Sequence, residues 1–180
     1  MAVLTAPDVA AYLRIEKSDK HDVLEEMCNA AQAAIEARVG PLEPTAVTAR
    51  VEGGGSVLFL PKTPALSLTS ITPLGGTALT VGDYWVSSGG TVRRNTSGYC
   101  FTADWYDVAY QAGFDPLPDD LLLAVKELVR HFWSTQRGGT QRPGSTPSDM
   151  LSNSIPGFAY TFPHRVSELI APYEQPGGFA

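Results

Sequence analysis

Histidines are the first candidates for chemistry, because imidazole acts as a general base or a metal ligand near neutral pH. The three of them, His21, His131 and His164, lie in separate segments, and none has another His or Cys at the spacing of a metal motif. His131 follows Arg130 near the end of a helical pattern, where the helix dipole favours positive charge. The sequence therefore predicts no metal site, and we expect no cofactor.

Two glycine-containing enzyme motifs also find no match. Residues 53–56 read Gly-Gly-Gly-Ser, but no lysine follows at P-loop spacing and a strand pattern comes next, so a hairpin turn is favoured. No G-x-S-x-G elbow occurs that could present a nucleophilic serine. With no catalytic constellation in the sequence, we expect a protein that is not an enzyme.

Carboxylates gather on one predicted helix, at Asp22, Glu25, Glu26 and Glu36. A catalytic acid and base would need apolar surroundings that raise one pKa, and these residues belong to the polar face of the helix. We interpret them as a solvated face, or as a face turned towards a solvent-filled channel.

Arg93 and Arg94 are the only adjacent basic pair of the chain. We interpret them as the polar end of a hairpin, with a contact to phosphate or to an acidic partner as the alternative. A pocket that gathers both arginines with a histidine would instead indicate an enzyme of small acidic substrates. The aromatic residues around them could stack on bases or sugars, but strand alternation makes most of them core or sheet-surface residues.

The length of 180 residues and the hydrophobic content of 43% are those of one folded unit. The net charge is -6, with 13 basic against 19 acidic residues, which argues against binding nucleic acid through its phosphates. Two cysteines without a C-x-x-C motif, and no secretory segment at the N-terminus, predict a reduced cytosolic protein. No apolar run approaches the roughly 20 residues that span a bilayer, so we expect no membrane partner.

The first 44 residues show helical periodicity. Thr5 and Asp8 form a capping-box pattern for a helix over residues 7–13, and a second helix is predicted over residues 20–39, ending at Gly40. Its expected inner face consists of Val23, Leu24, Met27, Ala30, Ala31, Ala34, Ile35 and Val39. The alanines of that face would let another helix approach closely.

From residue 45 the period changes from helical to alternating. Short runs of β-branched and aromatic residues are separated by glycine-rich turns, which predicts an antiparallel β-subdomain inserted between helices, packed as a small sheet or sandwich. The predicted strands cover residues 45–52, 56–60, 66–74, 84–87, 99–102 and 106–111.

The strongest helix signal follows Pro118 and stops at residues 138–139, which are both glycine. Its apolar stripe is broad, so this central helix must be covered on more than one side. Residues 140–155 can bury little apolar surface, and this composition predicts a long mobile loop. Residues 163–171 have the period of a short helix, and residues 172–180 form an extended tail whose aromatic residues suggest docking on another chain.

Three segments resemble head-tail connector, or adaptor, proteins of tailed bacteriophages and prophages: L-T-A-P-D-V-A-A-Y-L-R-I, N-A-A-Q-A-A-I-E-A-R-V-G, and the stretch from Ala112 to Arg137. The family pattern adds a P-x-x-P-x-x-S-I-like strand start, here residues 61–71, an A-G-[FY] strand end at residues 112–114, a P-x-x-[LI] helix start at residues 118–122, and L-[IL]-x-P-Y at residues 169–173. The resemblance runs through nearly the whole chain in the right order.

The resemblance implies a structural protein of the virion neck, made in the host cytoplasm. Such adaptors form a ring, commonly twelvefold, beneath the portal protein, continue the DNA channel and meet the stopper or tail-completion protein. DNA would pass through the channel without specific binding, and acidic residues in the lumen would repel its phosphates. The tail residues Pro172, Tyr173 and Phe179 would dock on the portal.

We therefore expect an α+β fold, a small helical bundle around a long central helix with an inserted antiparallel β-subdomain. Its parts are N-terminal helices at residues 1–44, the β-subdomain at 45–112, the central helix at 113–139, and a loop, short helix and tail at 140–180. The acidic face of the second helix would line the lumen or an intersubunit face, and Phe132 and Trp133 would contact a neighbouring subunit. The alternative is a cytosolic DNA-binding or regulatory module with a helix-turn-helix-like N-terminus, although its second helix is acidic.

Overall fold

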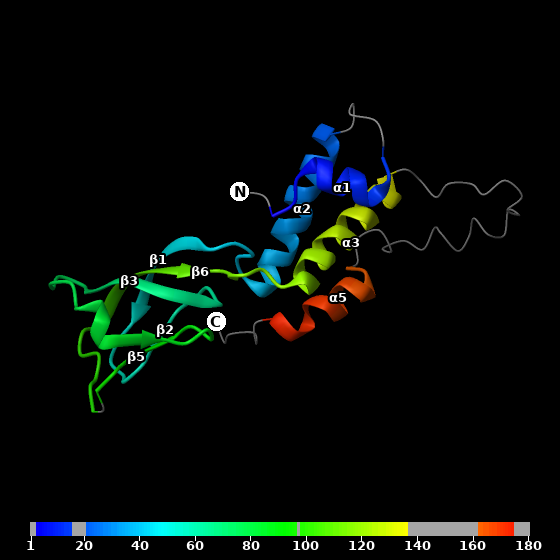
Figure 1. Ribbon diagram of the computed structural model, residues 1–180. Coiled ribbons are helices and arrows are strands. Elements are labelled where there is room, and N and C mark those ends of the chain that lie inside the picture. Colours follow the sequence, from blue (N-terminus) through cyan, green and yellow to red (C-terminus); the bar gives the residue numbers. More distant parts are fainter. Residues whose placement is uncertain (1–2, 16–20, 97, 137–161, 175–180) are drawn as a thin grey trace, which may run out of the picture. The chain divides into compact units, whose positions relative to one another are not determined.

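The computed structural model describes residues 3–15, 21–96, 98–136 and 162–174 (Figure 1). The chain divides into two compact units, a β unit of residues 36–118 and a helical unit of residues 2–35 and 119–174. Helices and antiparallel sheets are both present, so the expected α+β class is confirmed. The two units are described in turn.

The helical unit contains α1 (Ala6–Leu13), the first part of α2 (His21–Val39), α3 (Asp119–Gln136) and α5 (His164–Ile170), with a short 3-10 helix, η4 (Ala171–Tyr173), directly after α5. At the start of α1, the carboxylate of Asp8 accepts hydrogen bonds from the backbone N–H of Thr5 at 3.2 Å and from its hydroxyl at 2.5 Å. The predicted capping pair therefore fixes the first turn. Charge stabilisation by the Thr5 donors lowers the pKa of Asp8.

The buried side of α2 differs in part from the expected one. Val23 is 39% exposed and Ala30 is also exposed, so their predicted inward orientation is wrong. The buried stripe instead repeats at steps of three and four residues and includes a cysteine: Leu24, Met27, Cys28, Ala31, Ile35 and Val39. Val23 and Ala30 stand about 100° from the centre of this stripe on a helix of 3.6 residues per turn, which turns both out of the core.

The apolar stripe of α3 is buried at Leu121, Val125, Leu128 and Val129, as its periodicity predicts. This helix packs against α5 and also against α1. The broad apolar surface of α3 is therefore covered by α5 and by α1. A narrow apolar stripe could be covered by one neighbouring helix alone.

One carboxylate links three helices of this unit. Glu127 of α3 accepts a hydrogen bond from the Tyr12 hydroxyl of α1 at 2.9 Å and lies 3.7 Å from a guanidinium nitrogen of Arg165 on α5. Arg130, one turn further along α3, lies 3.8 Å from its other oxygen. The Glu127 side chain is only 13% exposed, so these contacts are largely shielded from water. Burial, followed by the hydrogen bond to Glu127, raises the pKa of Tyr12.

The β unit is a sandwich of two three-stranded antiparallel sheets, with strand orders β1-β6-β3 and β2-β5-β4. The first sheet consists of β1 (Thr45–Glu52), β6 (Trp105–Ala112) and β3 (Ala65–Pro73); the second consists of β2 (Leu58–Phe59), β5 (Thr91–Arg94) and β4 (Tyr84–Val86). A 3-10 turn, η2 (Val81–Asp83), leads into β4. In β6 every second residue from Tyr106 to Ala112 is buried, the alternation of a strand with one face in a core.

One predicted strand is absent, and one strand is present that the sequence does not predict. Residues 99–102 form no strand, and the strand β5 at residues 91–94 was not expected. Phe101 instead exchanges two backbone hydrogen bonds with the glycine turn, donating to Gly55 at 2.8 Å and accepting from Gly54 at 2.7 Å. Its ring is fully buried, and its centre lies 5.3–5.7 Å from the ring centres of Tyr84, Tyr99 and Tyr106. An aromatic-rich segment can therefore contribute a buried side chain to the core without forming a strand.

Tyrosine hydroxyls fasten loops to the sandwich core. The Tyr110 hydroxyl accepts a hydrogen bond from the Lys62 backbone N–H at 3.0 Å and donates to the Lys62 carbonyl at 3.2 Å. The Tyr106 hydroxyl accepts from the backbone N–H of Ala103 at 3.1 Å. Both rings are almost completely buried, so each tyrosine packs in the core with its ring and satisfies a backbone N–H group of a loop with its hydroxyl.

Candidate functional site

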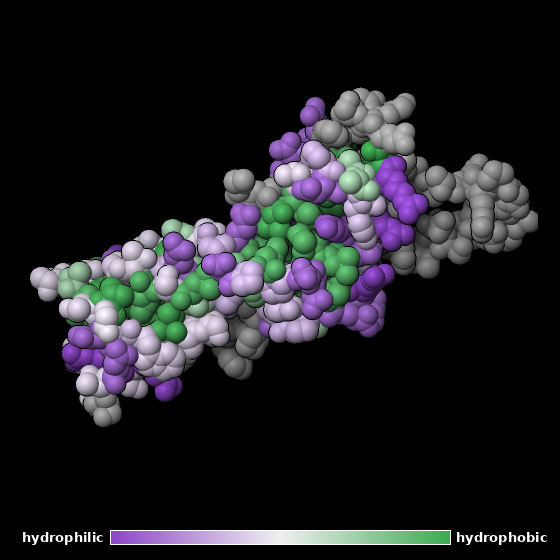
Figure 2. Space-filling model, viewed as in Figure 1, coloured by the Kyte–Doolittle hydropathy of each residue, from purple (hydrophilic) through white to green (hydrophobic). Residues whose placement is uncertain are grey.

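The exposed acidic residues of α2 lie where the sequence predicts them. Asp22, Glu25 and Glu26 are exposed on the part of α2 that belongs to the helical unit. On the face shown in Figure 2, apolar surface over the helices is bordered by hydrophilic side chains. Because α2 is acidic rather than basic on this side, the structure does not favour a DNA-recognition helix.

Glu36 differs from the other three carboxylates. It is half-buried in the β unit, and its side chain accepts a hydrogen bond from the Leu42 backbone N–H at 3.2 Å. This bond ties the end of α2 to the following loop. Glu36 thus has a local structural contact that the sequence pattern did not indicate.

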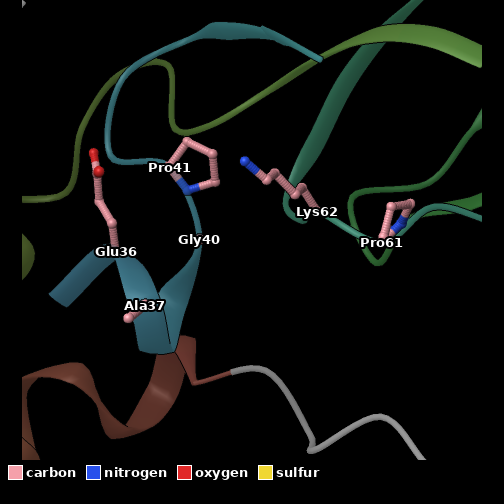
Figure 3. A pocket seen from close by; sticks show the side chains of 6 residues that line it. All are labelled: Glu36, Ala37, Gly40, Pro41, Pro61 and Lys62. Atoms are coloured by element: carbon pink, nitrogen blue, oxygen red, sulfur yellow. The ribbon is translucent and has the colours of Figure 1, made fainter. Parts of the chain in front are cut away.

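A pocket of about 390 Å³ lies beside this contact (Figure 3). Figure 3 shows that the end of α2 and the next loop form one wall, while the segment before β3 forms the other and sends Lys62 towards Pro41. The lining consists of Glu36, Ala37, Gly40, Pro41, Pro61 and Lys62. These described residues offer one carboxylate and one amine but no histidine, cysteine or hydroxyl nucleophile, so the pocket matches no catalytic arrangement.

A second pocket, of about 360 Å³, brings Arg93 and Arg94 together at the end of β5. We call it the arginine pocket. Its described lining residues are Ser56, Trp85, Arg93, Arg94, Asn95, Thr96, Gly98 and Tyr99. Both arginines are thus at the end of a β4–β5 hairpin, as predicted, and they also line a concave surface. No histidine is among these lining residues, so the combination that would indicate an enzyme of acidic substrates is not met.

Arg94 is held firmly in this pocket. The carbon at the centre of its guanidinium lies 4.4 Å from the Tyr99 ring centre and 6.0 Å from that of Tyr84. One terminal nitrogen lies 3.7 Å from a carboxylate oxygen of Asp83, while the Nε atom is buried without a hydrogen-bond partner in the described part of the chain. A cation held against aromatic rings can receive an anion at its terminal nitrogens, because the Arg94 side chain is 34% exposed.

The aromatic residues around the arginine pocket have mixed exposure. Tyr84 and Tyr106 are buried in strands and Phe101 is buried outside any strand, whereas Trp85 and Trp105 are 45% and 43% exposed on the sheet surface. Burial and then a hydrogen bond with Tyr99 raise the pKa of Tyr84. The exposed Trp85 gives the pocket an apolar wall beside its two cations.

Phe132 and Trp133 are both half-buried near the end of α3. Pro172 is exposed and Tyr173 half-buried, and both lie in η4, so the predicted extended backbone is wrong at these positions. The Glu174 backbone N–H donates to the Ile170 carbonyl at 3.1 Å, which continues the helical turn. Phe179 lies outside the described residues, as do the predicted loop at residues 140–155 and the predicted helix stop at residues 138–139.

The A-G-F motif at residues 112–114 has a steric explanation. Gly113 has a φ of 135°, and a Cβ atom there would collide with the Glu43 carbonyl. Its backbone N–H also donates to the Pro64 carbonyl at 2.9 Å, in the P-x-x-P segment. Two motifs that are distant in the sequence therefore meet in the β unit, and glycine is the residue that permits the contact.

The part of the chain that the structure describes contains no group of three His, Cys, Asp or Glu residues able to hold a metal ion. Among its helices, none combines the length and the apolar character that crossing a membrane requires.

A sequence model of the head completion protein family matches residues 2–165. Among curated proteins, none has a sequence that matches this chain. The match to the family agrees with the resemblance to head-tail connector proteins predicted from the sequence.

Solved structures with the same fold come from gene transfer agent (GTA) particles. A chain from the neck of an empty GTA particle, computed with C6 symmetry, has a TM-score of 0.65 at 20% identity, covering 98% of this chain and 92% of that one. A chain from the virion of a native GTA particle has a TM-score of 0.65 at 18% identity, with the same coverage of 98% and 92%. A chain from the neck of a native particle, computed with C12 symmetry, has a TM-score of 0.61 at 18% identity, covering 100% and 97%. At these identities the likeness shows a shared fold.

Proposed function

Since the chain belongs to the head completion protein family, we propose that it is a head-tail connector of the virion neck that assembles into a ring beneath the portal. The observation that carries this proposal is the match of nearly the whole chain, in family and in fold, to proteins of this class. The ring would continue the DNA channel from the head to the stopper or tail-completion protein. Its role is structural, without enzymatic chemistry or a cofactor.

The symmetric arrangement is supported by the solved relatives, whose neck structures were computed with C6 and C12 symmetry. A dodecamer satisfies both symmetries and is the proposed ring. Each subunit of such a ring must present two different surfaces, because neighbours meet head to tail.

Several surfaces are proposed for the contacts of the ring. The acidic residues Asp22, Glu25 and Glu26 of α2, with Glu36, would face the lumen or a neighbouring subunit. Phe132 and Trp133 would contact a neighbour, since both keep part of their apolar surface exposed at the end of α3. The tail with Pro172, Tyr173 and Phe179 would dock on the portal.

The proposed architecture assigns α3 as the centre of a small helical bundle that the inserted β-subdomain interrupts. The proposal is supported by the grouping of residues 2–35 and 119–174, from both sides of the insertion, into one compact unit. The four-part division at residues 44, 112 and 139 stays a prediction.

DNA would slide through the ring without specific binding, because a chain of net charge -6 does not neutralise many phosphates. This property separates a connector from a DNA-binding module. A mobility shift that weakens steeply with salt would favour the module instead.

The test is the oligomeric state of the purified protein, alone at high concentration and mixed with the portal protein, measured by light scattering and imaged by negative-stain electron microscopy. The proposal expects a closed ring, either in solution or assembled on the portal. A protein that stays monomeric in both conditions and never binds the portal would refute it.

A further inference from the structure

We propose that the arginine pocket receives the acidic residues of α2, namely Asp22, Glu25 and Glu26, from a second copy of this chain. The inference rests on the proposed ring, and it specifies which surfaces form the contact between neighbours. The partner surface is thus a row of carboxylates, and the acidic face is an intersubunit face rather than the lining of the lumen.

The chemistry of the pocket selects a carboxylate. Arg93 and Arg94 both line the pocket, and a guanidinium group binds a carboxylate through parallel N–H donors. As neighbours in β5 they point to opposite faces of the sheet, Arg93 opposite the exposed Trp85 and Arg94 opposite the buried Tyr84, so each would meet a different carboxylate of the partner. The Nε of Arg94 is buried and has no hydrogen-bond partner within the described residues. The donors that an entering carboxylate can reach are the terminal nitrogens of Arg94, whose side chain is 34% exposed and has one of these nitrogens 3.7 Å from an Asp83 oxygen.

The pocket is also shaped before any ligand arrives. Stacking on Tyr99, with centres 4.4 Å apart, fixes the guanidinium plane of Arg94 and reduces the conformational freedom that binding would remove. Side chains of Ser56, Asn95 and Thr96 on the lining add neutral hydrogen-bonding groups around the two cations. A rigid basic pocket of this kind gives a defined register between two proteins.

Charge complementarity identifies the occupant. The chain as a whole is acidic, with a net charge of -6, so a pocket with two cations contrasts with the rest of its composition. Asp22, Glu25 and Glu26 follow one another at helical spacing on α2, where all three side chains are exposed. On a helix these positions lie within about 100° of one another, so several carboxylates can approach one partner together.

The two surfaces belong to different units of the chain, the arginine pocket to the β unit and the acidic face to the helical unit. Two distinct, mutually complementary patches on one subunit are what a head-to-tail ring requires. An isologous dimer would instead need one self-complementary patch. This distinction favours a copy of the chain in a ring over a simple pair.

DNA is the other anion that could meet two arginines. Its binding depends on many neutralised phosphates, and the described lining of this pocket contains only Arg93 and Arg94 as cations. We therefore assign the pocket to protein carboxylates and include DNA in the test.

The test uses two charge-reversed proteins and their mixture. In the pocket variant, Arg93→Glu changes the exposed arginine while Arg94 stays in its aromatic contacts; in the face variant, Glu25→Lys and Glu26→Lys reverse the acidic surface. Each variant alone should lose assembly, with the concentration at half-assembly raised at least about tenfold, because the new glutamate meets the acidic face in one variant and the new lysines meet the arginines in the other. An equimolar mixture should assemble again, since each reversed pocket can meet a reversed face and each native pocket a native face around an alternating ring.

Lys62→Glu is the matched control. It changes the net charge by the same amount as Arg93→Glu on an exposed side chain of the same unit, outside the arginine pocket. It should assemble like the wild type, and circular dichroism should show that all variants are folded. Assembly is followed by sedimentation velocity for each protein and for the mixture.

The outcomes separate this inference from the ring itself. If the wild type forms rings and the pocket variant forms them equally well, or the mixture stays unassembled, the pocket assignment is wrong while the ring stands. If the wild type forms no ring with or without portal, the proposed function and the assignment both fail. The last outcome concerns DNA. If the wild-type protein binds DNA, and the Arg93→Glu variant no longer binds it but forms the same rings, the pocket serves DNA instead.

Discussion

The helical unit and the β unit bury different side chains. Among the described residues, the helical core is aliphatic, with Leu24, Leu121 and Leu128 fully or almost fully buried, whereas the β core is built around the aromatic rings of Phe101, Tyr106 and Tyr110. Helix periodicity places most of these aliphatic residues, because neighbours three and four positions apart share a face. The positions of the aromatic residues in the β unit depend also on contacts with loops, such as those of the Tyr110 hydroxyl with Lys62 and of the Tyr106 hydroxyl with Ala103.

The two units also differ in how they use charge. In the helical unit a shielded carboxylate, Glu127, joins α1 and α5 to α3. In the β unit the bidentate pair Arg50–Asp107 is exposed and joins only the adjacent strands β1 and β6. The pair in the β unit therefore joins strands that backbone hydrogen bonds already hold together, whereas Glu127 joins helices that contact one another through their side chains.

The largest predicted effect is that of Gly113→Ala in the β unit. The substitution should destabilise the protein by about 3 kcal/mol, because an alanine combines an unfavourable positive φ with a collision against the Glu43 carbonyl. Denaturant unfolding with hydrogen exchange by mass spectrometry would measure the loss and locate it in residues 36–118.

Gly75→Ala is the control for Gly113→Ala. Gly75 also has a positive φ, of 76°, but a Cβ atom there would meet nothing within 4 Å. It should lose only about 1 kcal/mol, the effect of the backbone conformation alone. Equal losses for the two variants would mean that the contact with Glu43 has no importance.

A smaller effect is predicted for Glu127→Ala in the helical unit. It removes the acceptor of the Tyr12 hydroxyl and the partner of Arg165. The free energy of unfolding should fall by about 2 kcal/mol, because hydrogen bonds to charged groups contribute more to stability than neutral ones. Hydrogen exchange should become faster in α1 and α5 together and stay unchanged in the strands.

Glu127→Gln is the control for Glu127→Ala, because it keeps an acceptor for Tyr12 and loses only the charge. Its loss should lie between those of the wild type and the alanine variant. If exchange accelerated in α3 alone, the idea that Glu127 joins three helices would have to be abandoned.

The smallest predicted effect concerns the exposed pair of Arg50 and Asp107. Their atoms are 2.8 Å and 3.2 Å apart in two hydrogen bonds, and the hydrogen bond from Arg50 lowers the pKa of Asp107. A lowered pKa stabilises the folded protein above the ordinary carboxyl value of about 3.9 and loses this contribution as the pH falls through the folded-state pKa. Asp107→Asn should therefore unfold slightly more easily at pH 7, by an amount that added salt reduces.

The measurement for Asp107→Asn is the denaturant midpoint of both proteins at pH 7 and at a pH well below the folded-state pKa of Asp107. The difference should vanish at the lower pH, where Asp107 is protonated in the wild type as well. A difference that persists there would assign the effect to packing rather than charge.

The sequence by itself determined the helices and most of the strands. Periodicity and the capping pair of Thr5 and Asp8 give α1, α2, α3 and α5 to within a few residues, because helix formation depends on neighbours close in the chain. The resemblance carried by the A-G-F and P-x-x-P segments identified the family that the comparison confirms.

Tertiary structure alone decided which residues meet across long separations. The strand β5, the irregular position of Phe101 and the clamp of Tyr110 on Lys62 arise from pairings between segments that no local pattern specifies. In the same way, the sequence shows Arg93 and Arg94 only as a basic pair, whereas the folded chain stacks Arg94 on Tyr99 and leaves its Nε without a described partner. Secondary structure follows largely from local spacing, but a binding pocket depends on distant residues that only packing brings together.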